Sequence, residues 1–133
     1  MIKIPYHLRP LSDLTSEDQH QAALIEWTEL PEIRTKYPML KWLFAVPNGG
    51  KRLAQTGSVL KQTGVKAGVP DLLLLYPMND CHGLIIEMKY GKNTPSKEQK
   101  AFMTYHTNLD YRCVVCYSWI EATQQIICYL SDF

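Results

Sequence analysis

Gly68-Val69-Pro70-Asp71 leads directly into the apolar run Leu72-Leu73-Leu74-Leu75-Tyr76, and a second apolar run, Leu84-Ile85-Ile86, ends in Glu87-Met88-Lys89. The turn-like segment Pro77-Met78-Asn79-Asp80 begins the connection between the two runs. The pattern predicts two paired strands joined as a hairpin. Such a hairpin brings the start of the first run next to the end of the second.

Three charged residues lie against these apolar runs. Asp71 begins the first run, and Glu87 and Lys89 end the second. Because side chains alternate across a strand, Glu87 and Lys89 share one face and Met88 points to the other. Charges in such an apolar setting are costly unless they are paired or bind a metal. Spacing alone leaves two interpretations open: a metal site, or a buried Glu–Lys ion pair beside an aspartate turn.

The remaining chain predicts an α/β fold with a mixed central sheet flanked by helices. At 133 residues, 46% apolar and 20% charged, we expect one globular domain over residues 1–133, with residues 1–14 as an irregular lead-in. A hairpin followed by a helical crossover to a further strand gives both antiparallel and parallel pairs. We expect helices over residues 15–30, 53–63, 96–108 and 118–130, a loop or short helical turn over 35–40, and strands over 42–46, 72–76, 84–88 and 111–117.

Charge and cysteine patterns narrow the function classes. The net charge is +1, but residues 42–70 contain no acidic residue and carry Lys51, Arg52, Lys61 and Lys66. This basic segment either binds phosphate groups or is an ordinary solvent-exposed surface. The chain has neither a signal-peptide pattern nor an apolar run of about 20 residues, so we expect a cytoplasmic protein without a membrane span. The Cys113-Val114-Val115-Cys116 motif lies in a predicted strand, where positions i and i+3 face opposite ways and cannot chelate one metal. We therefore expect the four cysteines, Cys81, Cys113, Cys116 and Cys128, to be buried core thiols.

Asp71 and Glu87 at neighbouring strand ends suit a hard cation such as Mg²⁺, with Mn²⁺ as a substitute. The main-chain carbonyl of Met88 is a candidate additional ligand. Lys89, on the same face as Glu87, is placed to orient a water molecule and stabilise charge on phosphorus.

Three motifs in order resemble the VRR-NUC family, a branch of the PD-(D/E)XK nuclease superfamily: Gly68-Val69-Pro70-Asp71, then Glu87-Met88-Lys89, then Thr94-Pro95-Ser96-Lys97-Glu98-Gln99. The resemblance covers nearly the whole chain and implies the αβββαβ core of that superfamily. It implies Asp71 and Glu87 as metal ligands, Lys89 as the motif lysine and Gln99 as a glutamine lining the site. Glu17 matches the acidic residue of the first helix, with Asp18 and Glu26 as alternatives.

The resemblance also implies a substrate and an assembly. Family members of this type resemble homodimeric endonucleases that act on branched DNA, Holliday junctions included. Asn48, Gly49, Lys51 and Arg52 match a loop expected near DNA. Lys66 and Lys92 are further candidate DNA contacts, or plain loop residues. The alternatives are an exonuclease or nickase of the same fold, and a DNA-binding module without cleavage.

Overall fold

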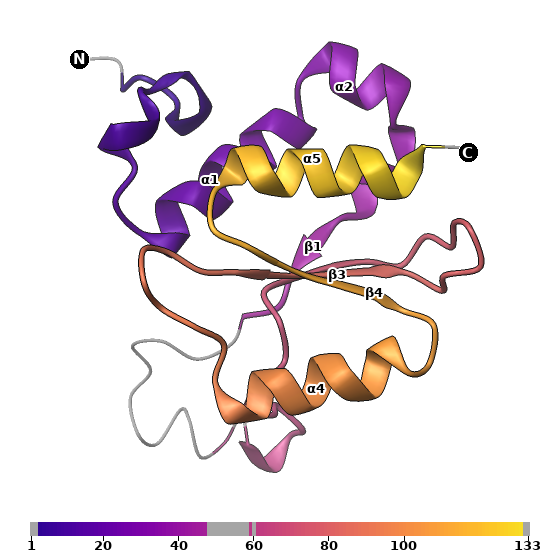
Figure 1. Cartoon of the computed structure of the whole chain (residues 1–133). Coiled ribbons are helices and arrows are strands. Elements are labelled where there is room, and N and C mark those ends of the chain that lie inside the picture. Colours follow the sequence, from indigo (N-terminus) through magenta and orange to yellow (C-terminus); the bar gives the residue numbers. More distant parts are fainter. Residues whose placement is uncertain (1–2, 48–58, 60, 132–133) are drawn as a thin grey trace.

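The computed structural model describes residues 3–47, 59 and 61–131. A four-stranded sheet lies between two helical layers (Figure 1). The strands are β1 (Phe44–Ala45), β2 (Leu72–Leu74), β3 (Leu84–Met88) and β4 (Arg112–Cys116). The helices are α1 (Glu17–Thr28), α2 (Pro31–Lys36), α4 (Lys97–Thr107) and α5 (Trp119–Leu130), with short 3-10 helices at Tyr6–Leu8, Leu11–Asp13 and Pro38–Trp42.

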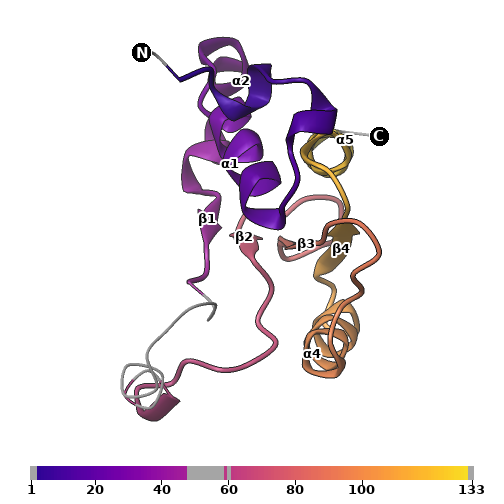
Figure 2. The same ribbon diagram turned by 90° about the vertical axis from the view of Figure 1, so that its left-hand side faces the viewer.

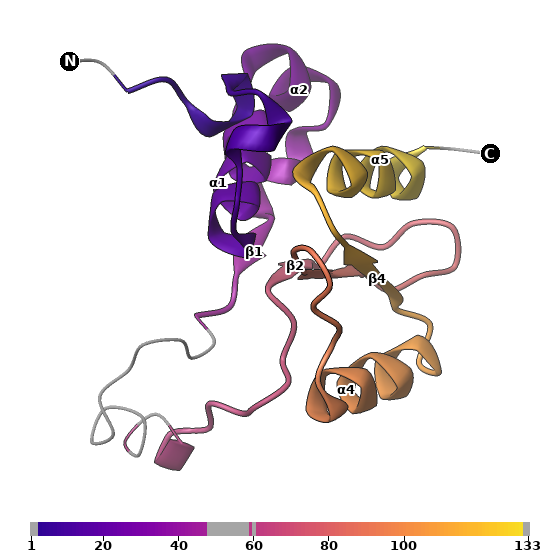
Figure 3. The same ribbon diagram turned by 60° about the vertical axis from the view of Figure 1, so that its left-hand side comes forward.

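The sheet is mixed, in the order β1-β2-β3-β4. β2 is antiparallel to both β1 and β3, whereas β3 and β4 are parallel. The parallel pair requires a crossover, which α4 supplies on one face of the sheet. Helices α1, α2 and α5 lie on the other side (Figures 2 and 3). The predicted mixed α/β fold is therefore confirmed.

Serine caps start the three longer helices. The hydroxyl oxygens of Ser16, Ser96 and Ser118 each accept a hydrogen bond from the amide three residues later, which satisfies an amide that the helix itself leaves unpaired. The caps of α1 and α4 place the first turns of both helices beside the end of β3. The capping serines thus determine where α1 and α4 begin, and residues in the first turns of these two helices belong to the candidate site.

The core fills the space between the sheet and the α1/α5 layer. One face of the hairpin contributes Leu72, Leu74, Leu84, Ile86 and Met88, all at most 1% exposed. The helices and β4 complete this cluster with, among others, Leu24, Cys116, Ala122, Ile126 and Tyr129. Alternation along β3 sends Met88 into this core and Glu87 to the face that α4 covers, as predicted.

The structure differs from the sequence expectations at the two short elements before the basic segment. Residues 31–36 form helix α2, which the sequence prediction missed, with Pro31 in its first turn where its missing N–H costs nothing. The strand predicted over 42–46 is shortened to β1, because Trp42 ends a 3-10 helix. The strand predicted to reach Tyr76 ends at Leu74. The helix predicted over 53–63 lies mostly outside the described residues, with residues 59, 61 and 62 helical.

The cysteines are free thiols. Cys116 is buried in the core as predicted, and burial raises the pKa of its thiol to about 12. Cys81 and Cys113 are half-buried, and Cys128 is exposed on α5, where the core prediction was wrong. No helix within the described residues is long and apolar enough to cross a membrane.

Candidate metal centre

Three carboxylates from three different elements meet at one end of the hairpin. Glu17 is the first residue of α1, Asp71 immediately precedes β2, and Glu87 lies near the end of β3. One carboxylate oxygen from each lies within 4.8 Å of the other two. The register pairs Leu72 with Ile86, so Asp71 and Glu87 arrive at the same end, as the hairpin predicted.

Glu87 is the most enclosed of the three. Its side chain is 1% exposed, and its Oε2 accepts a hydrogen bond from the Gln99 amide nitrogen at 3.1 Å. The Lys89 ammonium lies 3.3 Å from the same oxygen. The other oxygen, Oε1, is buried, and it has no hydrogen-bond partner among the described residues. A buried carboxylate oxygen normally has a partner, so this atom is available to bind a ligand.

The electrostatics of the site disfavour three bare negative charges. Burial raises the pKa of Glu87 to about 8, and the neighbouring Asp71 carboxylate contributes to the rise. The Lys89 ammonium opposes this shift but does not cancel it. In the metal-free protein, Glu87 therefore holds a proton near neutral pH, and a cation that bound there would displace it.

Gln99 is held at both ends of its amide. Its side-chain oxygen accepts from the Ser96 backbone N–H at 2.8 Å, while its nitrogen donates to Glu87. The Ser96 hydroxyl in turn accepts from the Gln99 backbone N–H, which completes a capping box. Turning the amide over would lose both side-chain bonds, so the helix cap fixes which end faces the carboxylate.

Asp71 is fixed by backbone contacts on both sides. Its Oδ2 accepts from the Met88 N–H at 2.7 Å, and its carbonyl accepts from the Val46 N–H at 2.8 Å. The approach to Asp71 is fixed as well: Gly68 has φ +86°, and a Cβ there would lie 2.6 Å from the backbone carbon of Glu98. Only glycine allows this contact between the segment before Asp71 and the first turn of α4.

The structure separates Glu17 from the two alternative acids on α1. Glu26 is engaged elsewhere, since its Oε1 lies 2.8 Å from both the backbone nitrogen and the Nδ1 of His7. Those contacts lower the pKa of Glu26 although burial acts in the opposite direction. Asp18 is exposed and is not one of the three converging carboxylates. Glu17 alone of the three acids joins Asp71 and Glu87.

The donor set fits a hard divalent cation. The convergent atoms are all carboxylate oxygens, which Mg²⁺ and Mn²⁺ prefer, and within the described part of the chain Oε1 of Glu87 has no hydrogen-bond partner. Among the described residues this is the only group of three metal-binding side chains. The main-chain carbonyl of Met88 stays a predicted ligand, while its N–H is used to hold Asp71.

The predicted DNA contacts are described only in part. Lys66 and Lys92 are exposed, with Lys92 in the turn after β3. Asn48, Gly49, Lys51 and Arg52 lie outside the described residues. Their assignment stays a prediction.

Asn93 was missed by the sequence analysis. Its amide nitrogen lies 3.5 Å from Oε2 of Glu17, a contact that joins residues 76 positions apart. An asparagine in a polar loop gives no periodicity or spacing signal, so only the fold reveals this proximity.

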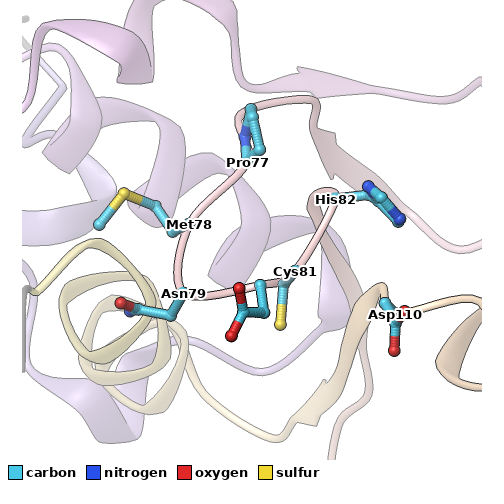
Figure 4. A pocket seen from close by; sticks show the side chains of 7 residues that line it. Pro77, Met78, Asn79, Cys81, His82 and Asp110 are labelled. Atoms are coloured by element: carbon cyan, nitrogen blue, oxygen red, sulfur yellow. The ribbon is translucent and has the colours of Figure 1, made fainter.

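A second surface hollow, of about 570 Å³, lies at the far end of the hairpin (Figure 4). Its lining includes a thiol, an imidazole and two carboxylates, from Cys81, His82, Asp80 and Asp110. In Figure 4 Cys81, His82 and Asp110 do not point toward a common centre. This hollow therefore lacks the convergence that marks the carboxylate site.

A mixed sheet with an aspartate before its second strand and a Glu-x-Lys at the end of its third defines the PD-(D/E)XK class of nuclease folds. The model of the VRR-NUC domain matches residues 15–119, and the chain belongs to this family. Among solved structures, a VRR_NUC domain protein is similar at 26% identity and a TM-score of 0.72, over 86% of this chain and 88% of that one. No curated protein matches the chain. The resemblance to the VRR-NUC family that the three motifs indicated is therefore confirmed.

Proposed function

We propose that the protein is a metal-dependent DNA endonuclease that acts on branched DNA, four-way junctions in particular, as a homodimer. The observation that carries the proposal is the convergence of Glu17, Asp71 and Glu87 within 4.8 Å, with Lys89 against Glu87. Membership of a nuclease-domain family supports hydrolysis of a phosphodiester.

In this proposal the three carboxylates hold Mg²⁺ or Mn²⁺, with the Met88 carbonyl as a further ligand. A bound cation would supply Lewis-acid chemistry, lowering the pKa of a water and neutralising charge that develops on the phosphate. Lys89 would orient the attacking water, and its ammonium would stabilise the charge that develops on the phosphate by electrostatics. Gln99 keeps Glu87 in its binding position through the hydrogen bond of 3.1 Å.

Exposed cations in the segments that lead into and out of the site support DNA as the substrate. Lys92 is exposed in the turn that follows β3, two residues after Tyr90. Lys66 is exposed in the segment that precedes Asp71. Lys51 and Arg52 belong to the same acid-free segment as Lys66. Positive side chains around a cleavage site bind the phosphates that flank the scissile bond, and they make binding salt-dependent.

An apolar surface beside the free edge of the sheet supports a homodimer. Trp42 is 71% exposed, Leu75 is 66% exposed and Phe44 is 43% exposed. They line a shallow hollow of about 270 Å³ with Met39 and Tyr76. A protruding tryptophan and a hollow on the same patch are suited to a two-fold contact, in which each copy offers the same surface.

Trp42→Lys should therefore convert a dimer to a monomer, as light scattering would reveal. A wild-type protein that is monomeric at tens of micromolar would contradict the dimer.

The activity is tested by incubating purified protein with labelled four-way junction, flap and linear duplex DNA, with Mg²⁺, with Mn²⁺ and with a chelator. We expect metal-dependent internal cuts, paired across the junction, and no cleavage by Asp71→Asn or Lys89→Ala although both still bind DNA. Products shortened from their ends would instead identify an exonuclease, and single cuts a nickase. Binding of every substrate without cleavage would identify a DNA-binding module.

A further inference from the structure

The turn after β3 contacts the first helix next to the candidate metal centre. The Asn93 N–H donates to the Tyr90 carbonyl at 3.2 Å, which closes a turn over residues 90–93. Gly91 within it has φ +63°, a left-handed conformation that glycine adopts without strain. In Figures 1 and 3 the segment between β3 and α4 passes close to the start of α1. Lys89, which begins this segment, is part of the site itself.

The turn is anchored on α1 at two points. The Tyr90 ring packs against the ring of His20, with centroids 5.7 Å apart and planes tilted by 34°. His20 is 2% exposed, and its Nδ1 accepts the Trp119 N–H at 3.1 Å, so this anchor is itself fixed by the start of α5. One helical turn earlier on α1, the Asn93 amide reaches Glu17. The two contacts set the first turn of α1 against the end of β3.

Of the three carboxylates, Glu17 is the least constrained by other contacts. Asp71 is held by a backbone N–H at 2.7 Å and Glu87 by a helix-capped glutamine. Glu17 is only half-buried, on a long side chain at the end of a helix, and it would lose rotamer freedom on binding a cation. A neutral amide donor orients the carboxylate without neutralising the charge that a cation requires.

We propose that Asn93 is a positioning residue for Glu17: its amide holds that carboxylate toward Asp71 and Glu87 and thereby raises the affinity of the centre for a divalent cation. The inference rests on the proposed metal site and adds a residue outside the three sequence motifs. In this proposal Asn93 acts through Glu17.

The test is calorimetric titration of Mn²⁺ into the metal-free protein, without DNA. Asn93→Ala should weaken binding about tenfold, the lower end of the effect of losing a hydrogen bond to a metal ligand. Thr94→Ala, in the same connection, is the matched control, because Thr94 is neutral and exposed. It should leave Mn²⁺ affinity unchanged. Thermal unfolding of metal-free Asn93→Ala should match that of the control, since Asn93 is exposed.

A double-mutant cycle separates positioning from a merely structural role. In the Glu17→Gln background, Asn93→Ala should cause no further loss of Mn²⁺ affinity, because the carboxylate it orients is gone. Equal and additive losses in both backgrounds would overturn the proposal, as would wild-type affinity in Asn93→Ala. If the wild-type protein itself bound no Mn²⁺, the metal site and the proposed function would fail together. That result is distinguishable from a failure of the Asn93 inference alone.

Discussion

Replacing Glu87 by glutamine tests whether ionisation of the buried Glu87 carboxylate destabilises the protein when no metal is added. The pKa of Glu87 is raised from 4.5 to about 8, chiefly by burial and by the nearby Asp71 carboxylate. Between these pH values the folded protein keeps the proton on Glu87, whereas the unfolded chain has released it. The stabilisation from this proton is complete below pH 4.5 and is lost as the pH rises toward 8.

The expected magnitude follows from the two pKa values. At about 1.4 kcal/mol for each pH unit, the interval from 4.5 to about 8 corresponds to roughly 5 kcal/mol of unfolding free energy. Glu87→Gln has nearly the same shape and does not ionise. The stability of the wild type relative to this variant should therefore fall steadily between pH 4.5 and 8, and the variant should be the more stable protein at pH 8.

The assay is urea unfolding of both proteins in chelator across this pH range. Comparing the two at each pH cancels the contribution of other groups, such as His20, whose burial lowers its pKa and whose protonation destabilises the fold toward acid pH. Saturating Mg²⁺ at pH 8 should stabilise the wild type and leave Glu87→Gln nearly unchanged. A difference in stability that does not vary with pH would refute the account of Glu87.

Three further results follow from the geometry of the site. Glu17→Gln should weaken cleavage and Mn²⁺ affinity together, whereas Glu26→Gln should leave both unchanged; the opposite pattern in the same two assays would show that another acid of α1 faces the centre. Gly68→Ala should destabilise the protein by about 1–3 kcal/mol in urea unfolding, because the added Cβ meets the Glu98 backbone at a positive φ; an unchanged midpoint would mean that this contact is not made. Lys92→Ala should reduce the slope of log binding constant against log salt concentration by about 0.9, one phosphate contact, in fluorescence anisotropy with junction DNA, and an unchanged slope would place Lys92 away from the DNA.

The hairpin and its charged residues were predictable from the sequence because their signals are local. Two continuous apolar runs with a turn-like segment between them predict the pairing of β2 with β3, and that pairing brings Asp71 to Glu87. Ser96 and Gln99, three residues apart, are the sequence signature of a capping box, and that box does form at the start of α4. The sequence left two interpretations of Glu87 and Lys89 open, an ion pair or a metal site; the structure places the Lys89 ammonium 3.3 Å from Glu87 with two more carboxylates beside it, and the metal site stays a proposal.

Features that depend on contacts between distant segments were not predictable. The sequence analysis matched Glu17 to the acid of the first helix but left Glu26 open, and the contact that engages Glu26 elsewhere, with His7, has no pairing signal in the sequence. The contact of Asn93 with Glu17 depends on how α1 sits against the end of β3. Trp42 lies in an apolar run that suggests a buried strand, yet it ends a 3-10 helix and is 71% exposed.

The central claim is that Glu17, Asp71 and Glu87 together form a divalent-cation site. The most direct test is an anomalous difference map from crystals of the protein soaked in Mn²⁺ at pH 8. The account predicts one strong peak within coordination distance of all three carboxylates, and its loss in Asp71→Asn. A map without a peak there, or with its strongest peak at the Asp80 and Asp110 hollow instead, would contradict it.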